Sequence, residues 1–127
     1  MLKEIMKFTG ILVAVLAVLS ISLPAGALNE GGIVAWPVPF NPSRQVLTIN
    51  YAPETTPGAP NRVKMEIFDI NGDKVYEGEY TGLPISWGGR NMSGRMVHPG
   101  MYIIKLTVEN TGTGQLGRRI IRIVVAR

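Results

Sequence analysis

The sequence predicts an all-β protein, an antiparallel β-sandwich of immunoglobulin-like size with about seven strands, preceded by a signal peptide. Three observations support this prediction. Apolar and polar residues alternate with a period of two in several short runs, which is the pattern of half-buried strands. Turn residues separate these runs about every 8–12 residues, and no run has the period of an amphipathic helix. A small open barrel has the same periodicity and remains the alternative.

The first 27 residues have the composition of a secretory signal peptide. Lys3 and Lys7 precede an uninterrupted apolar run, 11–19, and an Ala-x-Ala pattern ends at Ala27. The apolar run is shorter than the roughly 20 residues that span a bilayer. We therefore predict cleavage after Ala27 and an exported domain, 28–127, located in the periplasm, on the cell surface or outside the cell. A signal peptide engages the membrane only during export; a retained N-terminal anchor is the alternative, and it leaves the same domain outside the membrane.

Composition narrows the classes of function. The chain has no cysteine, so we expect neither a disulfide framework nor a thiolate metal site, and an exported domain of this kind suits a bacterial envelope. The net charge is +4, and basic residues are concentrated at Arg118, Arg119, Arg122 and Arg127. Nucleic-acid binders have denser basic stripes with interleaved aromatic residues. We therefore interpret these arginines as a solvated face of the last strand and expect no nucleic-acid partner.

The first two strands are expected on either side of a proline-rich segment. The first strand, 33–36, ends where three prolines fall within six residues, because proline cannot donate to a strand ladder. Trp36 and Phe40 need cover from water, so we expect both side chains to fold onto the edge of the core. The second strand, 45–51, has a large apolar residue at every second position from Leu47 onward.

The third and fourth strands, 62–70 and 74–80, are predicted to form a hairpin. They are joined across Asn71-Gly72, the strongest short hairpin signal, because a type I′ turn needs a positive φ at both central residues. The alternation of the third strand breaks at Phe68, which predicts either a bulge or burial on both faces.

A short fifth strand, 85–87, ends on Trp87 and leads into a long loop that contains Gly94 and Gly100. One large aromatic residue beside a tightly turned loop indicates a pinned loop and not a mobile lid. Trp87 is therefore expected to be buried and to stabilise this part of the domain.

Two long strands are expected at the C-terminal end, 101–109 and 118–126, joined by a loop at 110–117. In the first of them Tyr102 begins a regular alternation of apolar and polar residues. The last strand is strongly β-prone, and if it lies at a sheet edge its backbone can accept a partner strand. Its arginines would then act as gatekeepers against random pairing.

No set of residues in this sequence predicts catalysis. The single histidine, His98, precedes a proline in a turn, and one histidine cannot form a triad or the usual ligand set. Asp69 and Asp73 flank the Asn-Gly turn but provide too few oxygen ligands for a cation. No glycine-rich stretch opens a helix, as a phosphate loop would. We expect no enzyme activity, no cofactor and no metal site.

Four stretches in order resemble bacterial C-terminal sorting domains of the type IX secretion kind. Residues 36–43 are similar to the proline-rich opening of that family, and 67–75 to its central Asn-Gly hairpin. Residues 87–97 look like its tryptophan-led, glycine-rich loop, and 99–102 like the start of its penultimate strand. The immunoglobulin-like domain of flagellar hook-cap proteins has a similar layout. Val38 and Gly88 depart from the family, which has Asn and Asp there, so the resemblance carries over no ion site.

The resemblance implies a non-catalytic, exported β-sandwich module used for secretion sorting or cell-surface attachment, with proteins of the secretion machinery as partners. The alternative is a structural subunit that assembles an envelope or extracellular complex, similar to hook-cap domains. The candidate structural or interaction residues are Trp36, Phe40, Asn41, Asn71, Gly72, Trp87, Gly94, Gly100, Tyr102, Arg118, Arg119 and Arg122.

Overall fold

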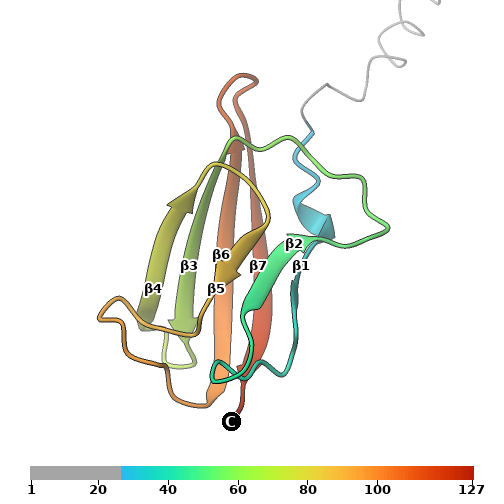
Figure 1. Cartoon of the computed structure of the whole chain (residues 1–127). Coiled ribbons are helices and arrows are strands. Elements are labelled where there is room, and N and C mark those ends of the chain that lie inside the picture. Colours follow the sequence, from blue (N-terminus) through green and yellow to red (C-terminus); the bar gives the residue numbers. More distant parts are fainter. Residues whose placement is uncertain (1–26) are drawn as a thin grey trace, which may run out of the picture.

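The computed structural model describes residues 27–127, and Figure 1 shows their arrangement. The predicted signal peptide, with its cleavage site after Ala27, lies outside the described residues except for Ala27 itself. No helix in the described part is long and apolar enough to cross a membrane.

The described residues form two antiparallel sheets that pack face to face, as Figure 1 shows. One sheet has the strand order β1-β2-β5 and the other has the order β4-β3-β6-β7. This confirms the predicted all-β sandwich of seven strands. The elements are a 3-10 turn η1 (Glu30–Gly32), then β1 (Ile33–Trp36), β2 (Leu47–Tyr51), β3 (Arg62–Asp69), β4 (Lys74–Tyr80), β5 (Ile85–Trp87), β6 (Gly100–Asn110) and β7 (Gln115–Val125).

The core lies between the sheets and follows the predicted alternation. In β2, β3 and β6 every second side chain is buried, because successive residues of a strand point to opposite faces. The buried residues of these three strands are Leu47, Ile49, Tyr51, Val63, Met65, Ile67, Tyr102, Ile104, Leu106 and Val108. Burying a side chain of this size stabilises the fold by about 1.5–3 kcal/mol, so this apolar surface holds the cysteine-free domain together.

The last hairpin is tighter than the sequence suggested. β7 begins at Gln115, opposite Asn110, and not at Arg118 as predicted. The Asn110 carboxamide oxygen accepts hydrogen bonds from the backbone N–H groups of Gly112 (3.0 Å) and Thr113 (3.2 Å), which closes the turn in few residues. Gly117, interpreted as a loop residue, lies inside the strand. A Cβ atom there would lie 2.6 Å from the Glu30 carboxylate carbon, so a larger residue at this position would displace the Glu30 side chain.

The β3–β4 turn is not the predicted type I′ turn. The Gly72 N–H donates to the Asp69 carbonyl at 3.1 Å, so Ile70 and Asn71 are the central residues. Within this turn only Gly72 has a positive φ, of 86°. The arrangement is a type I turn followed by a left-handed glycine. The Asp69 carboxylate favours it by accepting N–H bonds from Asn71 (2.9 Å) and Asp73 (3.0 Å).

The predicted irregularity at Phe68 is present. The pairing of β3 with β4 shifts between Ile67 and Phe68, as in a β-bulge. The pairing of β3 with β6 continues through the same residues without a shift.

Candidate recognition surface

Trp87 is the centre of an aromatic cluster that joins three parts of the chain. Its side chain is 3% exposed. Its ring centroid lies 5.9 Å from that of Phe40, 6.2 Å from Tyr76 and 6.5 Å from Tyr102. Tilted and edge-on aromatic pairs at these distances are favourable beyond the area that they bury. The cluster connects the proline-rich segment and both sheets, which confirms the predicted burial of Trp87.

The loop after β5 is held by hydrogen bonds at both of its sides. The Asn91 N–H donates to the Arg95 carbonyl and the Val97 N–H donates to the Gly89 carbonyl, both at 2.8 Å. The Asn91 carboxamide oxygen accepts from the backbone N–H groups of Ser93 and Arg95 at 3.0 Å each. This turn closes through Gly94, whose φ of 79° is the left-handed conformation that glycine tolerates.

Tyr102 fixes the end of the same loop, just after Gly100 begins β6 opposite Val125. Its hydroxyl group donates to the His98 carbonyl at 2.7 Å. Burial raises the pKa of the Tyr102 phenol; the negative charge of Asp69 adds to this shift and Arg127 opposes it. His98 therefore contributes its backbone to a structural bond.

The two aromatic residues next to the prolines differ in their exposure to solvent. Phe40 is fully buried, as predicted, but Trp36 is 42% exposed, so the prediction that Trp36 folds onto the core is wrong. The reason is strand parity: Ile33 and Ala35 face the core from β1, which leaves Trp36 on the outer side. Asn41 then shapes the turn, since its carboxamide oxygen accepts the Ser43 N–H at 3.0 Å.

Phe40 also forms backbone hydrogen bonds with the last strand and the residue that follows it. Its N–H donates to the Val124 carbonyl at 2.8 Å, and its carbonyl accepts the Ala126 N–H at 2.9 Å. The segment that follows β1 therefore crosses from one sheet to the edge of the other, where it pairs in parallel with β7.

The arginines of β7 do not form one patch. Arg119 lies opposite the buried Leu106, so it points inward, and its Nε donates to the Ile33 carbonyl at 3.0 Å. Arg118 and Arg122 have the opposite parity and are exposed on the outer face of the sheet. The interpretation of the C-terminal arginines as one solvated face is therefore wrong for Arg119, which links the two sheets.

The outer face of β7 alternates between apolar and cationic residues. Leu116, Ile120 and Val124 are 58%, 52% and 39% exposed, and Arg118 and Arg122 lie between them. We call these five residues the β7 stripe. It lies on an edge strand, because β7 ends the order β4-β3-β6-β7. Edge strands of this kind present backbone groups to which another strand can pair.

A pair of tyrosines that the sequence did not reveal lies on β4, the strand at the opposite edge of this sheet. The hydroxyl groups of Tyr76 and Tyr80 lie 2.8 Å apart, over Gly78. Burial, together with the hydrogen bond shared with Tyr76, raises the pKa of the Tyr80 phenol. The signal was present as Tyr-x-Gly-x-Tyr, which places two rings and the gap between them on one strand face.

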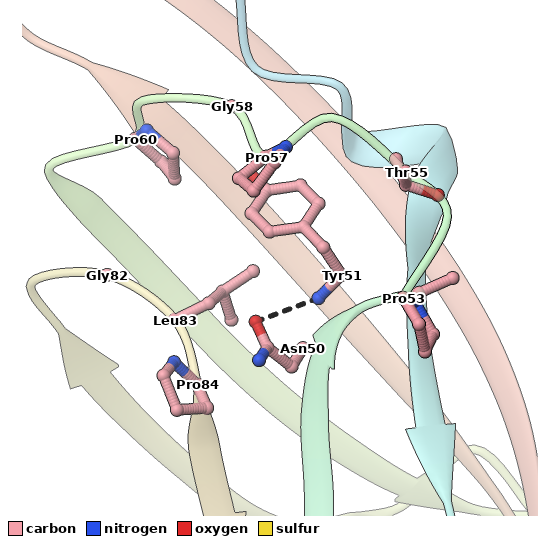
Figure 2. A pocket seen from close by; sticks show the side chains of 11 residues that line it. Asn50, Tyr51, Pro53, Thr55, Pro57, Gly58, Pro60, Gly82, Leu83 and Pro84 are labelled. Carbon is pink, nitrogen blue, oxygen red and sulfur yellow. Dashed lines mark hydrogen bonds between the residues drawn. The ribbon is translucent and has the colours of Figure 1, made fainter.

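A pocket lies between the β2–β3 loop and the β4–β5 loop. Figure 2 shows its lining around the ring of Tyr51, which includes Leu83 and four prolines: Pro53, Pro57, Pro60 and Pro84. No Asp, Glu, His, Lys or Arg lines this pocket. The Tyr51 hydroxyl donates to the Leu28 carbonyl at 2.8 Å, so the phenol has a structural partner.

The described residues contain no group of three or more His, Cys, Asp or Glu that could hold a metal ion. Asp69, considered above as a cation ligand, uses its carboxylate to organise the β3–β4 turn.

The structure thus brings Phe40, Trp87 and Tyr102 together and places Gly94 in the adjoining loop. Asn71 and Gly72 lie apart from this cluster, at an exposed hairpin turn. The fold and this arrangement define a β-sandwich in which the clustered aromatic residues are structural and the exposed β7 stripe follows an edge strand.

The chain matches the family described as the secretion system C-terminal sorting domain over residues 36–122. This match covers well over half of the sequence and includes all four stretches that suggested the resemblance. The protein therefore belongs to this family.

Two solved structures are similar to this chain. One is PorZ, a bacterial surface component of the type-IX secretion system of Porphyromonas gingivalis, at 22% identity and a TM-score of 0.56. The similarity covers 82% of this chain and 13% of that one. The other is dimeric latent PorU from Porphyromonas gingivalis, at 19% identity and a TM-score of 0.49, which covers 74% of this chain and 9% of that one. A comparison with curated proteins finds no match.

Proposed function

We propose that this protein is a non-catalytic, exported module for secretion sorting or cell-surface attachment, bound by proteins of the secretion machinery. The observation that carries this proposal is the family match, which runs from Trp36 to Arg122 and so includes the end of β1 and most of β7. The similarity to PorZ supports the fold of such a module. Its cellular destination is the cell surface or the medium.

The roles of the polar residues support a binding function over an enzymatic one. The Asp69 carboxylate and the Asn91 carboxamide are used to organise turns, and the Tyr102 hydroxyl bonds to the backbone. A catalytic site needs a nucleophile or acid–base group directed at a space where substrate can lie. The exposed β7 stripe is instead suited to contact with another protein.

The experiment is a delivery assay in a bacterium that has type IX secretion. The full chain is fused to an epitope-tagged reporter, and its surface exposure is measured by protease accessibility in intact cells. We expect exposure to require both this chain and the secretion channel. Equal exposure of the reporter without the chain, or in cells that lack the channel, would contradict the proposal.

The Arg118→Glu/Arg122→Glu double variant tests whether the β7 stripe takes part. Its control is Arg44→Glu/Arg95→Glu, which changes the charge equally at two exposed loop residues. We expect the first variant to lower surface exposure and the second to leave it unchanged.

A further inference from the structure

The open edge of β7 retains backbone groups that have no partner strand among the residues that the structure describes. The β6–β7 register runs without a shift from Asn110↔Gln115 to Gly100↔Val125, so the alternation along β7 is regular. Phe40 bonds to the Val124 carbonyl and to the Ala126 N–H. These two bonds show that the backbone groups of Val124 and Ala126 point to the open side of β7. By the alternation of an antiparallel strand, the N–H and C=O groups of Arg118, Ile120 and Arg122 face the same way.

Phe40 occupies only the C-terminal end of this edge. Among residues 27–127, the backbone hydrogen bonds on this side of β7 are the two made by Phe40. The fold itself thus pairs one extended segment with β7; toward Gln115 the edge is bordered by residues 27–30, which make no backbone hydrogen bond with β7 in the described part of the chain. Phe40 runs parallel to β7 and shows that this edge accepts an extended segment; the added strand would lie beside the remaining part of the edge and run antiparallel to β7.

The side chains along this edge indicate what the added strand would contain. Arg118 and Arg122 are four residues apart on an extended strand, or about 13 Å at the usual rise per residue. Carboxylates at the same spacing on a neighbouring strand would lie opposite them, and opposite charges on adjacent strands stabilise pairing. Leu116, Ile120 and Val124 would lie opposite aliphatic residues of the partner.

We propose that the β7 edge binds an extended protein segment in which acidic residues recur at every fourth position with aliphatic residues between them, by strand addition. This inference rests on the proposed function, since it names the kind of partner that the module would bind. A second copy of the chain is a poorer occupant. Its own β7 would bring Arg118 and Arg122 alongside the same two arginines, and like charges on adjacent strands destabilise pairing.

The test uses the full chain and the synthetic peptide Val-Thr-Glu-Thr-Val-Thr-Glu-Thr-Val. We expect saturable binding, with amide hydrogen exchange slowed at Arg118, Ile120 and Arg122. A peptide with lysine in place of both glutamates should bind about tenfold more weakly. The Arg118→Glu/Arg122→Glu variant should reverse this preference, and the Arg44→Glu/Arg95→Glu control should keep it.

Backbone methylation of the peptide separates strand addition from simple charge attraction. In the proposed complex the peptide runs antiparallel to β7, so the N–H groups of the valine and glutamate residues face β7, and those of the threonines face away. N-methyl groups on Val and Glu should abolish binding, while N-methyl groups on Thr should leave it within about twofold of the unmodified peptide, because no interstrand bond is lost.

Three outcomes would overturn the inference: no binding of the glutamate peptide, equal binding of the lysine peptide, or equal effects of the two methylation patterns. Concentration-dependent protection of the same amides without peptide would overturn it in favour of a second copy. Surface delivery is measured separately in cells. If delivery depends on the chain while the peptide fails to bind, the proposed function stands and strand addition fails.

Discussion

The indole Nε1 of Trp87 donates a 3.0 Å hydrogen bond to the carbonyl oxygen of Arg90, three residues further along the chain. The same ring packs between Phe40, Tyr76 and Tyr102. One side chain therefore fills the core with its ring and holds the following loop with its polar atom.

Replacing Trp87 with Ala should lower the free energy of unfolding by about 3–5 kcal/mol, because a large buried ring is removed and a cavity is left. Urea unfolding of the full chain, followed by circular dichroism, measures this change. Trp36→Ala is the matched control: Trp36 is 42% exposed, so its loss should cost less than about 1 kcal/mol. Equal costs for the two variants would show that the aromatic cluster does not centre on Trp87.

Arg119 and Arg118 are adjacent but should differ in their effect on stability. Arg119→Met removes the bond from Nε to the Ile33 carbonyl, and a hydrogen bond of this kind contributes about 0.5–1.5 kcal/mol. Arg118→Met changes an exposed side chain and should leave the unfolding temperature almost unchanged. Thermal melts of the two variants provide the comparison, and a larger loss for Arg118 would contradict the inward orientation of Arg119.

The tyrosine pair should make the protein less stable in alkali. The pKa of Tyr80 is raised in the folded state, so above the ordinary tyrosine pKa of about 10 the folded state binds more protons than the unfolded state. Stability is then complete below about pH 10 and falls as the pH rises. The free energy of unfolding, measured across this pH range, should fall less steeply for Tyr80→Phe than for the unchanged protein. The same dependence on pH in both proteins would contradict a raised pKa for the Tyr80 phenol.

Gly78→Ala should disturb the same pair. A Cβ atom at Gly78 would lie 2.8 Å from the Tyr80 hydroxyl oxygen and 3.1 Å from that of Tyr76. Overpacking of this kind costs about 1–3 kcal/mol. Gly112→Ala serves as the comparison, because the nearest atom to a Cβ there, the Asn110 side-chain oxygen, lies 3.3 Å away in an exposed loop. Thermal unfolding should rank Gly78→Ala as the more damaging change, and the opposite ranking would argue against this packing.

Asp69→Ala should weaken the β3–β4 hairpin, because two backbone N–H groups lose their acceptor. We expect a loss of about 0.5–2 kcal/mol, as for other side chains that cap backbone donors. Asn71→Ala is the control, since the Asn71 side chain is exposed and its backbone keeps the same bond. Urea unfolding compares the two variants. Equal losses of stability would show that the Asp69 carboxylate does not have the main role in this turn.

The strand pattern and the core could be predicted from the sequence because a period of two determines which residues share a face. The same rule applied to β1 places Trp36 outward, but its size and hydrophobicity suggested burial instead. The prediction of a type I′ turn at Asn71-Gly72 was wrong because the Asp69 carboxylate, two residues before Asn71, favours a different turn conformation. Arg119 could not be distinguished from Arg118 until the position of β7 relative to β1 was known, because the bond to Ile33 spans two sheets.

The crossing of the chain at Phe40 makes the final form of the β7 edge depend on completed folding. The exposed stripe belongs to the final strand, yet the residue beside that strand comes from the opening of the domain. If a partner binds this edge as proposed, it meets the finished edge only after both ends of the domain have come together, and its binding would then also report that the domain is correctly assembled.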